Sequence, residues 1–125
     1  TCIMAQRICR RICQECKEEV PLSAEVEADF KNVLGKLYPT GKKPVLAKGK
    51  GCETCNGTGY FGRIGIFEVL PVSEKISRLI LERAPAIDIE KRACEEGMVT
   101  MKQDGYLKVL EQVTTLEEVL RVAQD

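Results

Sequence analysis

Two cysteine pairs constrain the fold of this chain more than any other feature of its sequence. The first pair is Cys13 and Cys16. The second is Cys52 and Cys55, and in both pairs two residues separate the cysteines. A two-residue spacer lets both sulfurs of a pair face one ion, and two such pairs complete a tetrahedral shell of four thiolates. Thiolates favour zinc or iron–sulfur centres over hard cations. The spacing therefore predicts one structural zinc site, with these four cysteines as its ligands.

The predicted site argues against catalysis by this chain. Four thiolates fill the tetrahedral shell and leave no coordination position for water or substrate. The chain has no histidine, which removes the most common general base and all histidine-based triads. The stretch from Gly35 to Lys43 superficially resembles a phosphate-binding loop. However, five residues rather than four separate Gly35 from Gly41, and Lys43 stands where the motif needs Ser or Thr.

The cysteine content and the charged first residues of the chain favour a reducing compartment such as the cytoplasm. The chain has seven cysteines, and residues 1–20 carry several charges and do not resemble a signal peptide. Such a chain is expected to hold metal or reduced thiols rather than disulfides. No run approaches the ~18 apolar residues of a membrane-spanning helix. We therefore expect a cytoplasmic location and no membrane span. We expect Cys2, Cys9 and Cys94 to be small buried hydrophobes.

The first half of the chain contains one clear helix signal. Ser23 is a candidate N-cap. The apolar residues behind it recur with the period of one helical face, at Val26, Phe30, Val33, Leu34 and Leu37. Pro39 and Gly41 are expected to end this helix. Residues 3–12 are compatible with a strand or a helix, because periodicity alone does not separate the two. Residues 40–62 are rich in glycine and lysine and predict a loop.

The second half predicts a strand followed by helices. Residues 63–70 are β-branched or aromatic enough for a strand, which Pro71 ends. Ser73 is predicted to cap a helix that Pro85 breaks. The residues of that helix expected to face inward are Ile76, Leu79 and Ile80.

Three further caps are predicted in the last third of the chain. Asp88 is expected to cap a short helix that Gly97 stops. Capping-box spacing recurs in the pairs Thr100 with Gln103 and Thr115 with Glu118. Two apolar helix faces are expected to belong to the core. They are Tyr106, Val109, Leu110 and Val113, and then Leu116, Val119, Leu120 and Ala123.

Three separated blocks of the chain occur in the order and at the spacing that one protein family shows. They are Ala5-Gln6-Arg7-Ile8 with Arg10-Arg11-Ile12-Cys13 and Cys16, then Gly51-Cys52 onward to Leu70, and last Glu96-Gly97-Met98 with Gln103-Asp104-Gly105, followed by Thr114-Thr115-Leu116-Glu117-Glu118-Val119. Together they resemble the type II secretion and type IV pilus assembly ATPases of the tetracysteine, zinc-binding branch.

The resemblance implies an α+β, mainly helical fold. A zinc-knuckle insertion would lie between two adjacent strands, residues 3–11 and 63–70, at the edge of a RecA-like core, and a C-terminal helical subdomain would follow. The implied organisation has four parts. These are the last-strand region of the core (1–12), the tetracysteine module (13–60), the returning strand (61–72) and the helical subdomain (73–125).

The resemblance also implies a function. The chain would be the non-catalytic C-terminal part of a hexameric motor on the cytoplasmic face of the inner membrane, and its start would fall inside the ATPase core. Its partners would be neighbouring motor subunits and an inner-membrane platform protein. ATP and magnesium would bind only in the full-length parent, because the phosphate loop and the acidic and histidine-rich motifs of the family have no counterpart here. The apolar strand faces of such an isolated half-core are expected to be exposed.

Two other interpretations remain open. Residues 31–63 carry seven basic residues and one acidic residue, although the net charge of the chain is zero. A stand-alone zinc ribbon could use Lys42, Lys43, Lys48 and Lys50 of this stretch to bind nucleic acid or unfolded protein, but few aromatic residues are nearby for base stacking, so no nucleic acid is expected. Alternatively, Cys9, Cys13 and Cys16 have the spacing of a radical iron–sulfur enzyme. That enzyme fold needs a longer chain, and it leaves Cys52 and Cys55 unused.

Overall fold

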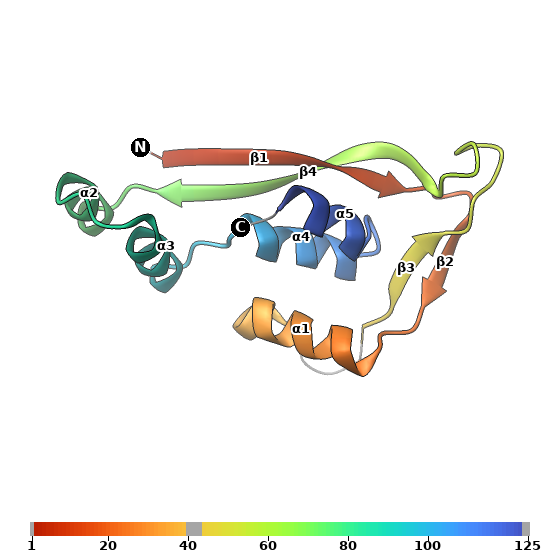
Figure 1. Cartoon of the computed structure of the whole chain (residues 1–125), viewed down its shortest axis with the longest axis horizontal. Coiled ribbons are helices and arrows are strands. Elements are labelled where there is room, and N and C mark those ends of the chain that lie inside the picture. The colour runs from red at the N-terminus through yellow and green to blue at the C-terminus, as the bar shows by residue number, and fades with distance from the viewer. Residues whose placement is uncertain (1, 40–43, 124–125) are drawn as a thin grey trace.

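The computed structural model describes residues 2–39 and 44–123, which form five α-helices and two antiparallel two-stranded sheets (Figure 1). The described part of the chain is therefore a mixed α/β structure. In chain order its elements are β1 (Cys2–Ile12), β2 (Lys17–Val20), α1 (Ala24–Leu34), a 3-10 turn (Gly35–Leu37), β3 (Leu46–Gly49), β4 (Tyr60–Pro71), α2 (Glu74–Leu81), α3 (Ala86–Glu95), α4 (Met101–Leu110) and α5 (Leu116–Val122).

The strands β1 and β4 form a long ribbon that carries the rest of the structure. They pair from Cys2 opposite Pro71 to Arg10 opposite Arg63, and the register shifts before Ile12. The ribbon settles the conformation of the first segment, which periodicity left open between strand and helix. A strand needs a partner for its backbone groups, and here the partner residues lie between 48 (Ile12 to Tyr60) and 69 (Cys2 to Pro71) positions away in the chain.

The helices α4 and α5 cover one face of the ribbon, and α1 packs on the other side of α4 (Figure 1). The predicted burial of Phe30, Leu34, Tyr106 and Val109 is confirmed. Val113, predicted to lie on the same helical face as Tyr106, instead follows the end of α4 at Leu110. The core residues are Cys9, Phe30, Leu34, Ile66, Tyr106, Val109, Val119 and Ala123.

The helix α1 belongs to the segment between the two long strands, and it is fastened to α4 by specific contacts. The rings of Phe30 and Tyr106 lie 4.6 Å apart between centroids. The Tyr106 hydroxyl donates a hydrogen bond of 2.7 Å to the Asp29 carboxylate. The Gln103 side-chain amide donates to the Val33 carbonyl at 3.0 Å. The inserted segment and the last helices therefore share one core.

Two carboxylates cap the outer edges of the ribbon. The Phe67 N–H, on the free edge of β4, donates to Asp104 of α4 at 2.9 Å. The Arg10 N–H, on the free edge of β1, donates to Glu118 of α5 at 2.8 Å. Unpaired N–H groups at a sheet edge are templates for unwanted strand pairing. These contacts satisfy one donor on each edge, and they fix both helices to the ribbon.

The prediction of a loop over residues 40–62 is wrong in two places. Residues 46–49 form β3, which pairs with β2 from Lys17 opposite Gly49 to Val20 opposite Leu46. In addition, β4 begins at Tyr60 rather than at residue 63. The strands of this hairpin are only four residues long and lack a clear alternation of apolar and polar residues, so pairing rather than local sequence defines them.

The predicted caps of α1 and α2 are confirmed, whereas the predicted end of α1 and the predicted cap of α3 are not. Ser23 caps α1 as predicted, but the α-helix ends at Leu34 and Leu37 is 38% exposed in the 3-10 turn. The predicted role of Gly41 lies outside the described residues. Ser73 caps α2 as predicted. By contrast, α3 begins at Ala86, so Asp88 lies inside its first turn and is not the cap.

The predicted end of α3 and the predicted caps of α4 and α5 agree better with the structure. Gly97 adopts a φ of 103° just after α3, as a helix-stopping glycine does. Thr100 and Gln103 form a complete capping box at α4. At α5 the Thr115 side chain accepts a hydrogen bond from the Glu118 N–H. The Glu118 side chain binds Arg10 and Arg121 instead of the backbone of the cap residue.

Several residues predicted to be buried are exposed. Ile80 is 43% exposed because only α3 packs closely against α2, at the end of the ribbon far from α1 (Figure 1). Leu120 is 40% exposed because the core covers only the opposite side of α5. Cys9 is fully buried as predicted, whereas Cys2 and Cys94 are exposed. Cys2 pairs with Pro71 at the start of the ribbon, and Cys94 lies near the end of α3.

Candidate metal centre

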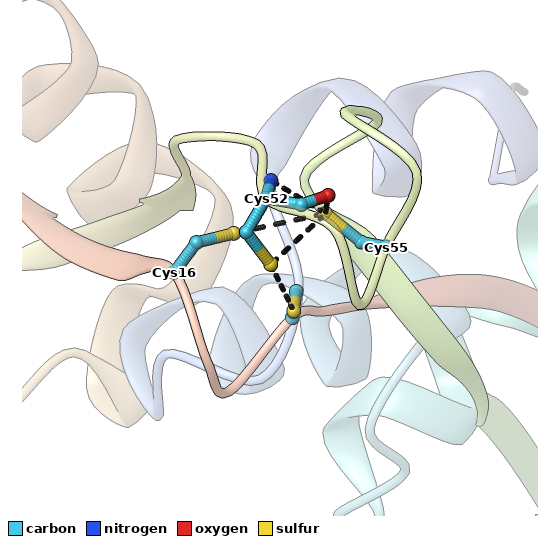
Figure 2. Close-up of side chains that lie close together, drawn as sticks. Cys16, Cys52 and Cys55 are labelled. Atoms are coloured by element: carbon cyan, nitrogen blue, oxygen red, sulfur yellow. Dashed lines mark hydrogen bonds between the residues drawn. The ribbon is translucent and has the colours of Figure 1, made fainter.

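The structure brings the four predicted ligand cysteines together at one end of the ribbon. Cys13 and Cys16 lie in the turn from β1 to β2, and Cys52 and Cys55 lie in the loop from β3 to β4. Their sulfurs all lie within 4.8 Å of one another. Figure 2 shows the side chains of Cys16, Cys52 and Cys55 pointing toward one another from these two segments. The two sheets bring the segments together, because each sheet pairs a strand beside the first cysteine pair with a strand beside the second.

The spacing of the sulfurs fits a tetrahedral zinc ion. Zinc–sulfur bonds of about 2.3 Å place neighbouring sulfurs about 3.8 Å apart in a tetrahedron. The Sγ atom of Cys52 is 3.7 Å from that of Cys13 and 3.7 Å from that of Cys55. The Sγ atoms of Cys16 and Cys55 are 3.8 Å apart. The cluster therefore has both the donor set and the size that a four-thiolate metal site requires.

Backbone N–H groups surround two of the sulfurs. The Cys55 sulfur accepts from the N–H groups of Cys52 at 3.3 Å and Gly59 at 3.2 Å. The Cys16 sulfur accepts from the Gly51 N–H at 3.2 Å. Such donors stabilise negative charge on sulfur, so they favour the thiolate form that binds a metal.

The thiol pKa values reflect competition within the cluster. Desolvation opposes ionisation of Cys55, but the N–H groups of Cys52 and Gly59, together with the thiols of Cys52 and Cys16, outweigh it and lower its pKa to about 6. The Gly51 N–H favours the Cys16 thiolate, but desolvation and the neighbouring cysteines outweigh this donor and raise the pKa of Cys16 to about 11. Four negative sulfurs this close repel one another, and a divalent cation among them removes that penalty.

A glycine pair lets the two loops approach. A side chain at Gly49, the last residue of β3, would overlap the Gly59 carbonyl. Gly59 in turn has a φ of 83° and lies just before β4. The Cys13 N–H donates to the Gly59 carbonyl at 3.0 Å, and the Lys50 N–H donates to the Cys16 carbonyl at 3.1 Å. These backbone contacts hold the two cysteine loops against each other.

Sequence reasoning missed the charged group that fastens β1 to α5 next to the cysteine cluster. The Glu118 side chain is only 2% exposed. Its carboxylate accepts from the Arg10 guanidinium at 3.0 Å and from the Arg121 guanidinium at 2.9 Å and 3.1 Å. Desolvation opposes ionisation of Glu118, but the hydrogen bonds from Arg121 and Arg10 outweigh it and lower its pKa to about 2. We name Arg10, Glu118 and Arg121 the arginine clamp.

No local pattern in the sequence pointed to this clamp. Glu118 lies three residues after Thr115, so the sequence predicted that its side chain would bond back to the helix cap. That prediction was wrong for the Glu118 side chain. Its partner Arg10 is 108 residues away. This pairing of distant residues forms only because the fold places α5 against β1.

The turn between α4 and α5 joins the clamp to the first cysteine pair. The Ile12 N–H donates to the Val113 carbonyl at 2.8 Å, directly before Cys13. The Thr114 hydroxyl donates to the Arg10 carbonyl at 2.8 Å. The hydroxyls of Tyr60 and Thr115 are 2.8 Å apart. The last helices therefore contact the chain on both sides of the cysteine cluster.

The structure describes two of the four lysines of the basic stretch, Lys48 and Lys50. Lys42 and Lys43 lie outside the described residues. Lys48 contacts Glu18 across the β2–β3 hairpin at 3.6 Å. None of the helices in the described ranges is long and apolar enough to cross a membrane.

The comparisons with known proteins agree with the resemblance seen in the sequence. The model of the family described as type II/IV secretion system protein matches residues 1–121. The type IV pilus assembly ATPase PilB of Thermus thermophilus is 41% identical over 118 residues, which cover 94% of this chain and 13% of that protein. PilB of Pseudomonas aeruginosa is 38% identical over 128 residues, which cover 98% of this chain and 21% of that protein.

A type II secretion ATPase resembles this chain with a comparable sequence identity. The type II secretion system ATPase E of Vibrio cholerae is 36% identical over 125 residues, which cover 98% of this chain and 23% of that protein. The chain thus spans less than a quarter of the length of these three relatives.

Proposed function

Because the chain belongs to the type II/IV secretion system protein family, we propose that it is the non-catalytic, zinc-binding C-terminal region of a motor ATPase. The parent motor would drive type IV pilus assembly or type II protein secretion, as the names of its relatives indicate for those proteins. The convergence of the four cysteine sulfurs within 4.8 Å is the observation that carries the zinc assignment.

In this proposal the zinc ion is structural. When bound, it supplies four metal–sulfur bonds that link the turn after β1 to the loop before β4. Structural zinc contributes about 10–16 kcal/mol to folding in small zinc modules, which is comparable to the ~5–15 kcal/mol stability of a whole domain. The chain's own residues do the remaining work, because backbone N–H groups orient the sulfurs and the arginine clamp holds α5 against β1.

The wider assignments concern the parent protein. We propose that the β1–β4 ribbon is the edge of a RecA-like core, that the segment 13–60 is a module inserted into that edge, and that residues 73–125 form a helical subdomain. ATP and magnesium would bind in the part of the parent upstream of this chain. The motor would form a hexamer on the cytoplasmic face of the inner membrane and act on a platform membrane protein. The exposed apolar residues of the ribbon, such as Met4 at 63% and Phe67 at 42%, support a covered position in a larger protein.

Metal content per chain tests this proposal. Elemental analysis of the purified chain should find one zinc per chain, and Cys52→Ser should lose it. Cys94→Ser is the matched control, because Cys94 is an exposed thiol outside the cluster. Zinc uptake that does not change with Cys52→Ser would contradict the centre. Hydrolysis of ATP by the purified chain would contradict its non-catalytic role.

A further inference from the structure

The four sulfurs of the cysteine cluster are not equally accessible. Cys13 is fully buried and Cys55 is 4% exposed, whereas Cys16 and Cys52 are only partly buried. An oxidant dissolved in water therefore reaches the sulfurs of Cys16 and Cys52 first. Accessibility alone leaves two candidates for the first site of oxidation.

Hydrogen bonding separates these two candidates. The Cys16 sulfur accepts from the Gly51 N–H at 3.2 Å. Among the described residues, no backbone N–H donates to the sulfur of Cys52. An N–H donor stabilises the charge on the sulfur lone pairs that would attack an oxidant. Cys52 therefore combines access to solvent with the more nucleophilic sulfur.

Hydrogen bonding also distinguishes the two neighbouring sulfurs with which Cys52 could form a disulfide. Its sulfur is 3.7 Å from two others, those of Cys13 and Cys55. The Cys55 sulfur is held by two N–H groups, those of Cys52 and Gly59. Within the described ranges, no backbone N–H donates to the Cys13 sulfur. Cys13 is therefore the better nucleophile to complete a disulfide with Cys52, and that bond would join the two loops of the cluster.

We propose that Cys52 is a hydroperoxide-sensitive site whose oxidation forms a Cys13–Cys52 disulfide and releases the metal. This inference rests on the zinc centre proposed above. In the first step the Cys52 thiolate attacks one oxygen of hydrogen peroxide. The O–O bond breaks, an S–O bond forms, and the products are a sulfenic acid and hydroxide.

In the second step the Cys13 thiolate attacks the Cys52 sulfur. An S–S bond forms, the S–O bond breaks, and a second hydroxide leaves. The two sulfurs together lose two electrons and the peroxide gains them. Two of the four ligands are then in a disulfide, and the remaining pair, Cys16 and Cys55, cannot complete a closed zinc shell. The centre therefore couples the metal content of this region to the presence of peroxide.

The test uses the complete zinc-loaded chain. Hydrogen peroxide is added, released zinc is measured with a colorimetric chelator, and disulfides are mapped by mass spectrometry after proteolysis. We expect release of about one zinc per chain with a Cys13–Cys52 link, and recovery after a thiol reductant and zinc are added. The matched control is the Cys2→Ser/Cys94→Ser double variant, which keeps all four ligands and lacks both exposed thiols outside the cluster. Its release should equal that of the unmodified chain.

The possible failures are distinguishable. A purified chain without stoichiometric zinc overturns the proposed centre, and this inference with it. Zinc retained at a peroxide dose that oxidises the exposed Cys94 overturns the inference and leaves the centre intact. Release that requires Cys2 or Cys94, or a Cys52–Cys55 link in place of Cys13–Cys52, overturns the assignment of the reacting pair.

Discussion

Arg10 and Glu118 are 108 residues apart in the chain, yet one carboxylate accepts both the backbone N–H of Arg10, at 2.8 Å, and its guanidinium, at 3.0 Å. The contact lies three residues before Cys13, the first cysteine of the cluster. The same carboxylate binds Arg121 within α5. The arginine clamp thus joins the free edge of the ribbon, the last helix and the approach to the metal centre.

Replacing Glu118 with glutamine should destabilise the chain by about 1–2 kcal/mol, because two arginines lose the carboxylate that they bind, although both are more than half exposed and water can solvate them. Urea unfolding at pH 7 measures the change. Glu117→Gln is the matched control, since Glu117 is exposed on the same helix and should shift stability by less than about 0.5 kcal/mol. Equal effects of the two substitutions would show that the clamp does not contribute to stability.

Stability should fall in acid through Glu118. Its folded pKa of about 2 lies below the ordinary value of 4.5, so between these values the unfolded chain binds the extra proton. The contribution is complete above about pH 4.5 and is lost as pH falls toward 2. Its size is at most about 3 kcal/mol. Unfolding measured from pH 7 to pH 3 should therefore show the gap between the wild-type chain and Glu118→Gln narrowing. A constant gap would contradict the depressed pKa.

The contact between the cysteine loops should depend on Gly49. Gly49→Ala places a methyl group against the Gly59 carbonyl, and such overpacking costs about 1–3 kcal/mol. Gly57→Ala is the control, because its φ of 77° is strained for alanine but its side-chain position is open; it should cost about 1–2 kcal/mol. Only Gly49→Ala should also speed the loss of zinc to a competing chelator. Equal zinc loss from both variants would argue against the loop contact.

Removing the metal should open residues 13–60 to protease, because the zinc–sulfur bonds would contribute much of their stability. Hydrogen exchange should also rise at the Ile12 N–H, which donates to the Val113 carbonyl beside the cluster. The centre of α1 should respond less, since Phe30 and Asp29 are held by Tyr106. Protease resistance that survives chelation throughout 13–60 would contradict the structural role of the metal.

The helix caps could be predicted because they depend on a few neighbouring residues. Ser23, Ser73 and Thr100 each accept the N–H three residues ahead, as their spacing indicates. The hairpin of β2 and β3 could not, because four-residue strands such as Leu46–Gly49 carry little local signal. The prediction that Ile80 is buried failed for a related reason. Periodicity identifies the apolar side of α2 but not whether another element covers it.

The sequence by itself determined which cysteines converge, because two closely spaced pairs with thiolate chemistry leave few other arrangements for one metal shell. The tertiary structure decided that residues 3–12 form a strand, that the sulfurs of Cys13 and Cys52 lie 3.7 Å apart, and that Glu118 binds Arg10. The physical reason is distance along the chain. A cap or a cysteine pair is set by neighbouring residues, whereas a strand, a buried ion pair or an exposed thiol is defined by partners that only the folded chain brings into contact.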